Sequence, residues 1–217
     1  MNSIDRDEQP RNFKPLDLIS NRDFTLLLYV GISGSVTMTL RTLVSAQWLY
    51  HETGSAATLG LLGVVQFLHM PLAVYGGILA DRVDRKKLMA ITQLSAFLLL
   101  IFLTGLAWKE MLEPWHIFAI TGVSGIFNML GSAARPAMLP RLVPRALLTH
   151  AVTSQTACFQ VSGILAPILF WQLYDYLGVT TAFAVASIIA LTSAVTPLLI
   201  RASGQSDQSK IENTFKS

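Results

Sequence analysis

The chain has 217 residues, of which 52% are hydrophobic and 13% are charged. Soluble domains carry about 25% charged residues, so this composition excludes an ordinary soluble globular domain. The formal net charge is +3. Because the cations lie in short segments between apolar runs, they do not form the continuous basic patch of a nucleic-acid-binding protein.

Six apolar segments follow one another along the chain. A helix that spans a bilayer needs about 20 mostly apolar residues. In hydrocarbon every backbone N–H and C=O group must be hydrogen-bonded within the protein, and a helix achieves this within one segment. We predict transmembrane helices at residues 24–50, 57–80, 88–108, 114–134 (continuing to 139), 146–174 and 176–200. The sequence therefore predicts an all-α integral membrane protein with a six-helix bundle over residues 23–201.

The segments outside the predicted bundle are polar. Residues 1–22 contain Asp5, Asp7 and Glu8 and no apolar core, so they are not a cleavable secretion signal. We interpret them as a cytoplasmic amino-terminal tail and residues 202–217 as a polar cytoplasmic tail that follows the bundle. The lone cysteine, Cys158, lies in the fifth predicted helix, which excludes an internal disulfide bond.

Lysine and arginine residues are distributed unevenly over the two sides of the bundle. If the chain crosses the membrane six times, its two terminal segments, the link between helices two and three and the link between helices four and five all lie on one side. All lysine and arginine residues except Arg41 and Lys109 lie in or near these segments. Positive charge in short loops marks the cytoplasmic side. We therefore expect a multi-pass protein of the inner (plasma) membrane with both termini in the cytoplasm.

The polar segment after the second apolar run resembles the signature loop between helices two and three of the major facilitator superfamily. It reads Gly77-x-Leu79-Ala80-Asp81-Arg82-x-Asp84-Arg85-Lys86, with Asp84 where the usual pattern has a glycine. Further segments, "NRDF" at 21–24 and "RPAMLPRLVPRALLTHA" at 135–151, resemble the enterobactin-exporter-like branch and related drug exporters. The resemblance covers almost all of residues 20–200.

This resemblance implies a fold and a function. The six helices would form the amino-terminal half of a twelve-helix major facilitator fold, built as a 3+3 inverted repeat. The implied activity is secondary active export of a drug-like or siderophore-like small molecule in exchange with protons. The implied gating loop contains Gly77, Asp81, Arg82, Asp84, Arg85 and Lys86. Asp81 would contact a helix of the second half and hold the cytoplasmic side closed. The cations of the loop would either take part in this contact or only determine the orientation in the membrane.

Polar residues inside the predicted helices are the candidates for a transport pathway, because such groups are costly in a bilayer and usually face a cavity or a partner. The candidates are Arg41, Gln66, His69, Asn128 and Gln160. Arg41 either attracts an anionic group of a substrate, pairs with a carboxylate of a missing half, or has a structural role. His69 shares a helix face with Gln66 and is either a proton-coupling group or a packing residue.

No chemistry of catalysis is visible in the sequence. The four histidines, at positions 51, 69, 116 and 150, are scattered, and no nucleophile–base pair, metal-ligand cluster or phosphate-binding glycine loop is present. We therefore predict a protein that is not an enzyme and needs no cofactor. Its expected partners are a small-molecule substrate, protons and the lipid bilayer, and no nucleic acid.

The chain turns polar after residue 200, and a second set of six helices does not follow. We expect a truncated form or amino-terminal half of a transporter, completed by a missing carboxy-terminal half or by a second copy. The alternatives are a six-helix homodimeric transporter and a non-transporting membrane remnant or interaction protein.

Overall fold

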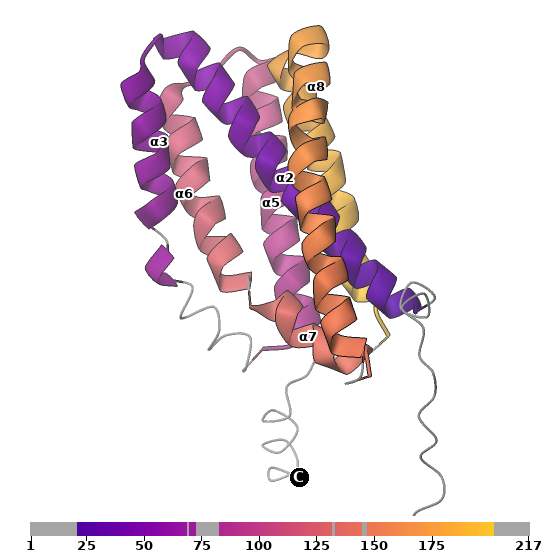
Figure 1. The fold of residues 1–217 in the computed structure, drawn as a ribbon. Helices are drawn as coiled ribbons and strands as arrows, with labels where there is room; N and C mark the ends of the chain where they lie inside the picture. Colours follow the sequence, from indigo (N-terminus) through magenta and orange to yellow (C-terminus); the bar gives the residue numbers. More distant parts are fainter. Residues whose placement is uncertain (1–20, 69, 73–82, 132, 145–146, 202–217) are drawn as a thin grey trace, which may run out of the picture.

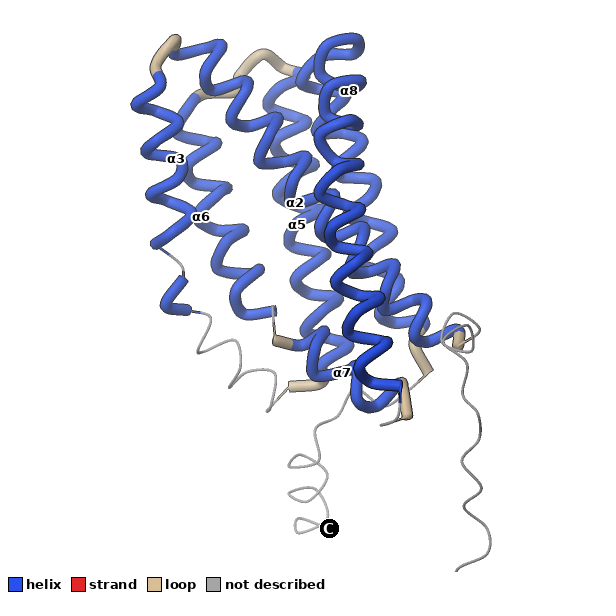
Figure 2. Tube along the Cα trace, in the orientation of Figure 1, coloured by secondary structure: helices blue, strands red, loops and turns tan. Residues whose placement is uncertain are grey.

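The computed structural model describes residues 21–68, 70–72, 83–131, 133–144 and 147–201, and within these ranges every regular element is helical (Figures 1 and 2). The elements are α2 (Arg22–Thr53), α3 (Ala56–Leu68), the short 3₁₀ helix η1 (Met70–Leu72), α5 (Arg85–Trp108), α6 (Pro114–Gly131), α7 (Ala134–Leu142) and α8 (Leu148–Leu199). The long helices run roughly side by side as a bundle (Figure 1). The predicted all-α class is confirmed.

Helix α2 begins and ends at residues that suit helix termini. The side chain of Asn21 accepts hydrogen bonds from the backbone N–H groups of Asp23 and Phe24, at 3.1 and 3.3 Å, and so caps the first turn. The last residue is Thr53, after which Gly54 has φ 61° and donates its N–H to the carbonyl of Tyr50. This left-handed conformation is the usual glycine terminus of a helix.

Helix α5 begins directly after the position where the chain departs from the superfamily pattern. Asp84 is its N-cap residue, and the carboxylate accepts hydrogen bonds from the N–H groups of Lys86 and Lys87, at 2.9 and 3.4 Å. A carboxylate at a helix N-terminus also interacts favourably with the helix dipole. The aspartate therefore has a local structural role in defining the helix start.

Helix α8 folds back on itself at Gly178. This residue has φ 80° and ψ 174°, a conformation that only glycine adopts readily. The two arms of α8 lie side by side in Figure 1, and residues from both ends, Ala151 and Ile200, belong to one apolar cluster. The sequence predicted the break at Asp175, and this was wrong by one turn. Asp175 is the charge that interrupts the apolar run in the sequence. The chain reverses its direction at Gly178 instead, because glycine can adopt a positive φ.

Within the part of the chain that the structure describes, four helical segments are long and apolar enough to cross a membrane: Arg22–Thr53, Arg85–Trp108, Pro114–Leu142 and Leu148–Leu199. These correspond to the first, third, fourth, and combined fifth and sixth predicted spans. The second predicted span, 57–80, begins with α3, which is a shorter apolar helix. Its continuation over residues 73–80 lies outside the described residues.

Two apolar clusters form the interior, one at each end of the bundle. The cluster that we name the proximal core consists of Phe24, Leu27, Leu88, Met89, Ala134, Met138, Leu139, Leu142, Val143, Leu147, Ala151 and Ile200. The second, the distal core, includes Leu40, Val44, Leu100, Leu103, Ile117 and an alanine stripe on the second arm of α8. Ala182, Ala186 and Ala190 in this stripe are fully buried, because small residues let helices approach closely.

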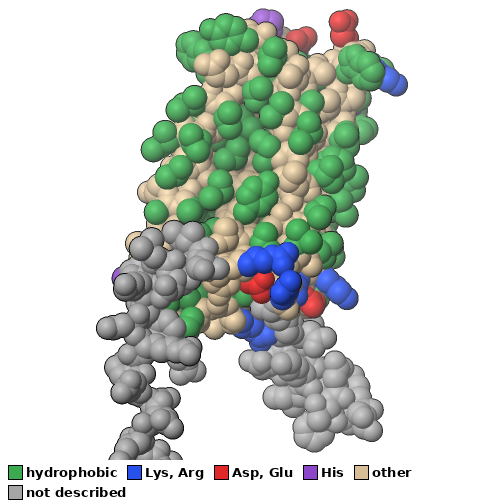
Figure 3. All heavy atoms as spheres, turned by 90° about the vertical axis from the view of Figure 1, so that its right-hand side faces the viewer, with side chains coloured by type: hydrophobic (Ala, Val, Ile, Leu, Met, Phe, Trp, Pro, Cys, Tyr) green, Lys and Arg blue, Asp and Glu red, His purple; other side chains and the backbone are tan. Residues whose placement is uncertain are grey.

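The surface is apolar along the middle and charged at the ends. Leu98, Phe102, Ile164, Ile188 and Leu198 are all more than half exposed, as a lipid-facing surface requires. Figure 3 shows lysine and arginine side chains gathered at one end. We name this the cation-rich end; its described cations are Arg22, Arg85, Lys86, Lys87, Arg141 and Arg201.

Candidate functional site

Three adjoining cavities lie along α2 and α6, and the first two are also lined by α5. The first has a volume of about 190 Å³ and is lined by Val30, Gly34, Ser35, Met38, Met89, Thr92, Gln93, Asn128, Gly131, Arg135 and Phe159. The second is small, about 30 Å³, and extends it toward Arg41 and Ser124. The third, about 220 Å³, is lined by residues of α2, η1 and α6 and by Gln66 and Phe67 of α3. Met38 and Asn128 line all three cavities, so we treat them together as the central site.

The structure brings three of the five predicted pathway residues together at this site. Arg41 lines the second and third cavities, Gln66 lines the third, and Asn128 lines all three. Gln160 is exposed on the first arm of α8 and lines none of them. His69 lies outside the described residues.

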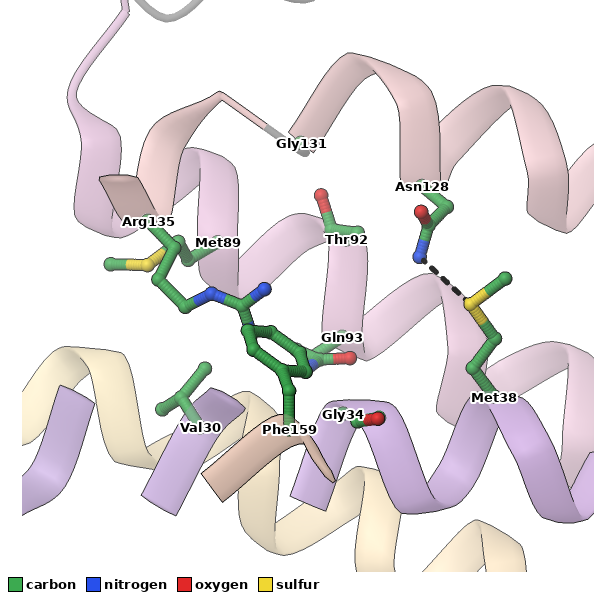
Figure 4. Close-up of a pocket in the computed structure, with 11 residues that line it drawn as sticks. Val30, Gly34, Met38, Met89, Thr92, Gln93, Asn128, Gly131, Arg135 and Phe159 are labelled. Carbon is green, nitrogen blue, oxygen red and sulfur yellow. Dashed lines mark hydrogen bonds between the residues drawn. The ribbon is translucent and has the colours of Figure 1, made fainter. Parts of the chain in front are cut away.

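Asn128 projects between α6 and α2. Its side-chain amide donates a weak hydrogen bond to the sulfur of Met38 at 3.9 Å (Figure 4). An amide carries two donors and a carbonyl acceptor, so this weak contact, the one that Asn128 makes within the described ranges, leaves most of its hydrogen-bonding capacity available at the wall of the cavities. Methionine is flexible and polarisable, which suits a surface that adapts to a ligand.

Two glycines bring polar side chains into the central site. A Cβ atom at Gly34 of α2 would collide with the side-chain amide of Gln93, and one at Gly131 of α6 would collide with the side chain of Thr92. Gln93 also donates to the hydroxyl of Ser193 at 2.8 Å. The sequence did not identify Thr92 or Gln93 as candidates. Their signal was polarity within an apolar helix, the same signal that identified Gln66.

Arg135 is the second cation at the site. The sequence placed it among the cations that mark the cytoplasmic side, but its guanidinium lies 4.4 Å from the centre of the Phe159 ring and lines the first cavity (Figure 4). The side chain passes over Gly31, where an added Cβ would lie 3.1 Å from a guanidinium nitrogen. Its Nε atom is buried without a hydrogen-bond partner among the described residues.

The electrostatic character of the site follows from its lining. Arg41 and Arg135 line it, and among the described residues that line the three cavities there is no aspartate or glutamate. The remaining walls combine amides and hydroxyls with methionine, leucine and phenylalanine. Such a surface can bind an amphiphilic molecule, with apolar contacts for its body and fixed donors for its acceptor groups.

The predicted gating loop is only partly described. Gly77, Asp81 and Arg82 lie outside the described residues. Arg85 donates to the carbonyl of Ala137 at 2.7 Å, and Lys86 donates to the carbonyl of Ile200 at 2.7 Å. These two loop cations therefore already connect the start of α5 to α7 and to the end of α8.

An all-helical bundle with a lipid-compatible surface and a polar central site defines an integral membrane protein. A model of the Major Facilitator Superfamily matches residues 26–215 of the chain. The chain therefore belongs to this superfamily, as its loop between the second and third apolar runs suggested.

Curated relatives agree with this assignment. Macrolide efflux protein A of Streptococcus pyogenes is 29% identical over 157 residues, which cover 71% of this chain and 38% of that protein. The protein of the same name from Enterococcus faecalis is 29% identical over 151 residues, 68% of this chain and 46% of that protein. An uncharacterized MFS-type transporter, YfiS of Bacillus subtilis, is 27% identical over 129 residues, 58% of this chain and 30% of that protein.

The matched regions span less than half the length of these relatives. No solved structure matches the chain.

Proposed function

We propose that the chain is the amino-terminal half of a secondary active exporter of a drug-like or siderophore-like small molecule, driven by exchange with protons. The observation that carries the proposal is the meeting of Arg41, Gln66 and Asn128 at adjoining cavities inside an otherwise apolar bundle. Superfamily membership supports transport, and the names of the macrolide efflux relatives support export of an antibiotic-like molecule.

The proposed architecture has six crossings. They are α2, the segment that begins with α3, α5, α6 with α7, and the two arms of α8 on either side of Gly178. The walls of the central site come from α2, α3, η1, α5 and α6 together with Arg135 of α7 and Phe159 of α8, so in this proposal one half supplies part of the wall around a substrate. The second half, or a second copy, would supply the remaining wall, and exposed Gln160 would face it.

The test is transport by two proteins in proteoliposomes with an imposed proton gradient. One is the 217-residue chain alone, and the other is this chain joined to the carboxy-terminal half of macrolide efflux protein A of Streptococcus pyogenes. The probes are radiolabelled erythromycin and 8-anilinonaphthalene-1-sulfonate. Alternating access needs two bundles that rock around a central site, so we expect gradient-driven flux of at least one probe with the joined protein only.

Arg41→Ala in the joined protein should lower this flux about tenfold or more, without loss of protein from the membrane. Lys109→Ala at the opposite end is the matched control and should leave the flux unchanged. Equal flux by the chain alone would establish a six-helix homodimeric transporter instead. Absence of flux from both proteins, each correctly inserted, would favour the membrane remnant or interaction protein.

We further propose that the cation-rich end faces the cytoplasm in the plasma membrane, because short segments with many cations are retained there. Cysteines introduced at Ser55 and Glu113 should react with an impermeant maleimide in intact cells, and a cysteine at Lys87 should react only after permeabilisation. Labelling of Lys87→Cys in intact cells would reverse the assigned orientation.

A further inference from the structure

The two arginines of the central site lack a described counter-ion. Within the described residues Arg41 forms no hydrogen bond or ion pair, and Arg135 contacts the face of Phe159 while its buried Nε atom has no hydrogen-bond partner. A buried charge without a partner is costly, and a buried N–H donor without an acceptor costs roughly 1–3 kcal/mol. The described residues thus leave Arg41 half-buried without a counter-ion and the buried Nε atom of Arg135 without an acceptor.

Arg41 and Arg135 line two cavities that adjoin each other and share lining residues. The first cavity, which Arg135 lines, and the second, which Arg41 lines, share Gly34, Met38, Thr92, Gln93 and Asn128. The side-chain amides of Gln93 and Asn128 therefore line the space that both cations border, and an amide nitrogen has two hydrogens to donate to the oxygens of a bound anion. The Thr92 hydroxyl donates to the Leu88 carbonyl at 2.9 Å and is not such a donor. Figure 4 shows Arg135, Gln93, Thr92 and Asn128 around this space.

The apolar part of the lining excludes a small hydrated anion as the preferred ligand. Phe159 forms the wall below the Arg135 guanidinium, and Met38, Met89 and Val30 line the same cavity. An inorganic anion would lose its hydration there without gaining apolar contacts. A molecule with an aromatic or aliphatic body and an acidic group would satisfy both kinds of surface.

We propose that the central site selects an anionic amphiphile, a molecule with an apolar body and a carboxylate, sulfonate or phosphate group that binds between Arg41 and Arg135. This inference rests on the proposed function, because it names the class of substrate that the same site accepts. Guanidinium groups suit such acids because they donate several hydrogen bonds in a planar fork. A cationic amphiphile would meet two like charges, so we expect it to bind more weakly than an anionic one with the same apolar body.

The test is equilibrium binding to the purified 217-residue chain in lipid nanodiscs, with empty nanodiscs as the background. The probes are 8-anilinonaphthalene-1-sulfonate and N-phenyl-1-naphthylamine, which share the same fused and phenyl rings and differ in the sulfonate. We expect saturable binding of the sulfonate, about tenfold or more tighter than that of the neutral amine. Because this readout is binding, a chain that does not transport can still support or contradict the inference.

Variants assign the preference to the two arginines. Arg41→Gln and Arg135→Gln should each weaken binding of the sulfonate about tenfold, and should change binding of the neutral amine less than about twofold, which also shows that the variant is folded. Arg41→Lys keeps the charge and should retain most of the preference. Lys109→Gln removes a cation remote from the site and should have no effect.

Three results would overturn the proposal: equal affinity for the two probes, an unchanged preference in both Arg→Gln variants, or loss of the preference once the chain is joined to a carboxy-terminal half. The last result would mean that Arg41 and Arg135 pair with carboxylates of that half. Transport of erythromycin by the joined protein together with equal binding of the two probes would leave the proposed function standing and remove only this inference.

Discussion

The two ends of the bundle are held together in different ways. At the cation-rich end, side chains reach across the fold: Asn21 donates to the carbonyl of Leu142 at 3.0 Å, and Lys86 donates to that of Ile200 at 2.7 Å. The carboxylate of Asp23 accepts from the backbone N–H of Arg201 at 3.1 Å. These partners are 121, 114 and 178 positions apart in sequence.

The opposite end shows only local bonds of this kind among its described residues. Thr53 and Thr58 share a hydrogen bond across the α2–α3 turn, five positions apart. At the α5–α6 turn, His116 accepts from the N–H of Glu113, and Trp115 donates to the Glu113 carboxylate. Between helices, this end depends on the apolar packing of the distal core.

The comparison shows that the cations at one end have two roles. They lie where a topology signal is expected, and at least Arg85 and Lys86 also bind carbonyl groups of distant helices. We therefore expect a substitution of Arg85 or Lys86 in the predicted gating loop to change stability as well as any latch. A gating phenotype at Arg85 or Lys86 is informative only when the free energy of unfolding has been measured too.

The largest expected effect contrasts two glycines, one near each end. A Cβ atom at Gly131 meets the Thr92 side chain, including its branch point, whereas one at Gly105 meets nothing within 4 Å. Gly131→Ala should lower the free energy of unfolding by about 1–3 kcal/mol, because a packed helix must shift. Gly105→Ala should leave it unchanged or raise it by up to ~1 kcal/mol through helix propensity. Unfolding by dodecyl sulfate in mixed micelles measures both, and equal effects would contradict the described α5–α6 packing.

Next in size is the loss of the Asn21 side chain, which caps α2 and also binds Leu142. Asn21→Ala should destabilise the protein by about 2 kcal/mol, the sum of a helix cap and a tertiary hydrogen bond. Thr58→Val at the other end removes only bonds to neighbours in sequence and should cost about 0.5 kcal/mol. The same unfolding assay compares them. A larger loss for Thr58→Val would reverse the contrast between the ends.

The smallest expected effect concerns two lysines. Lys86→Met removes the donor to the Ile200 carbonyl and should lower the free energy of unfolding by about 1 kcal/mol. Lys109→Met, an exposed position at the opposite end, should change it by less than about 0.5 kcal/mol. Amide hydrogen exchange near Ile200 should rise in Lys86→Met alone. Unchanged exchange there would show that the Lys86 bond does not hold the end of α8.

The sequence by itself predicted the class of protein and singled out three polar residues that line the central cavities. Long uncharged runs predict helices in lipid because the backbone must satisfy its own hydrogen bonds there, and this requirement depends on nothing distant in the chain. The superfamily loop gave the family, which the comparisons confirmed. Arg41, Gln66 and Asn128 stood out because polar groups are rare in such runs, and all three line the central site.

Only the tertiary structure decided which way each polar side chain faces. These helices are apolar on every side, so periodicity cannot show which face is buried; Gln160 and Gln93 look alike in sequence, yet one is exposed and the other lines the site. Arg135 looked like a loop cation until the close approach at Gly31 and the ring of Phe159 fixed its position. Packing between helices sets their rotation, and that rotation determines which residues meet at the central site.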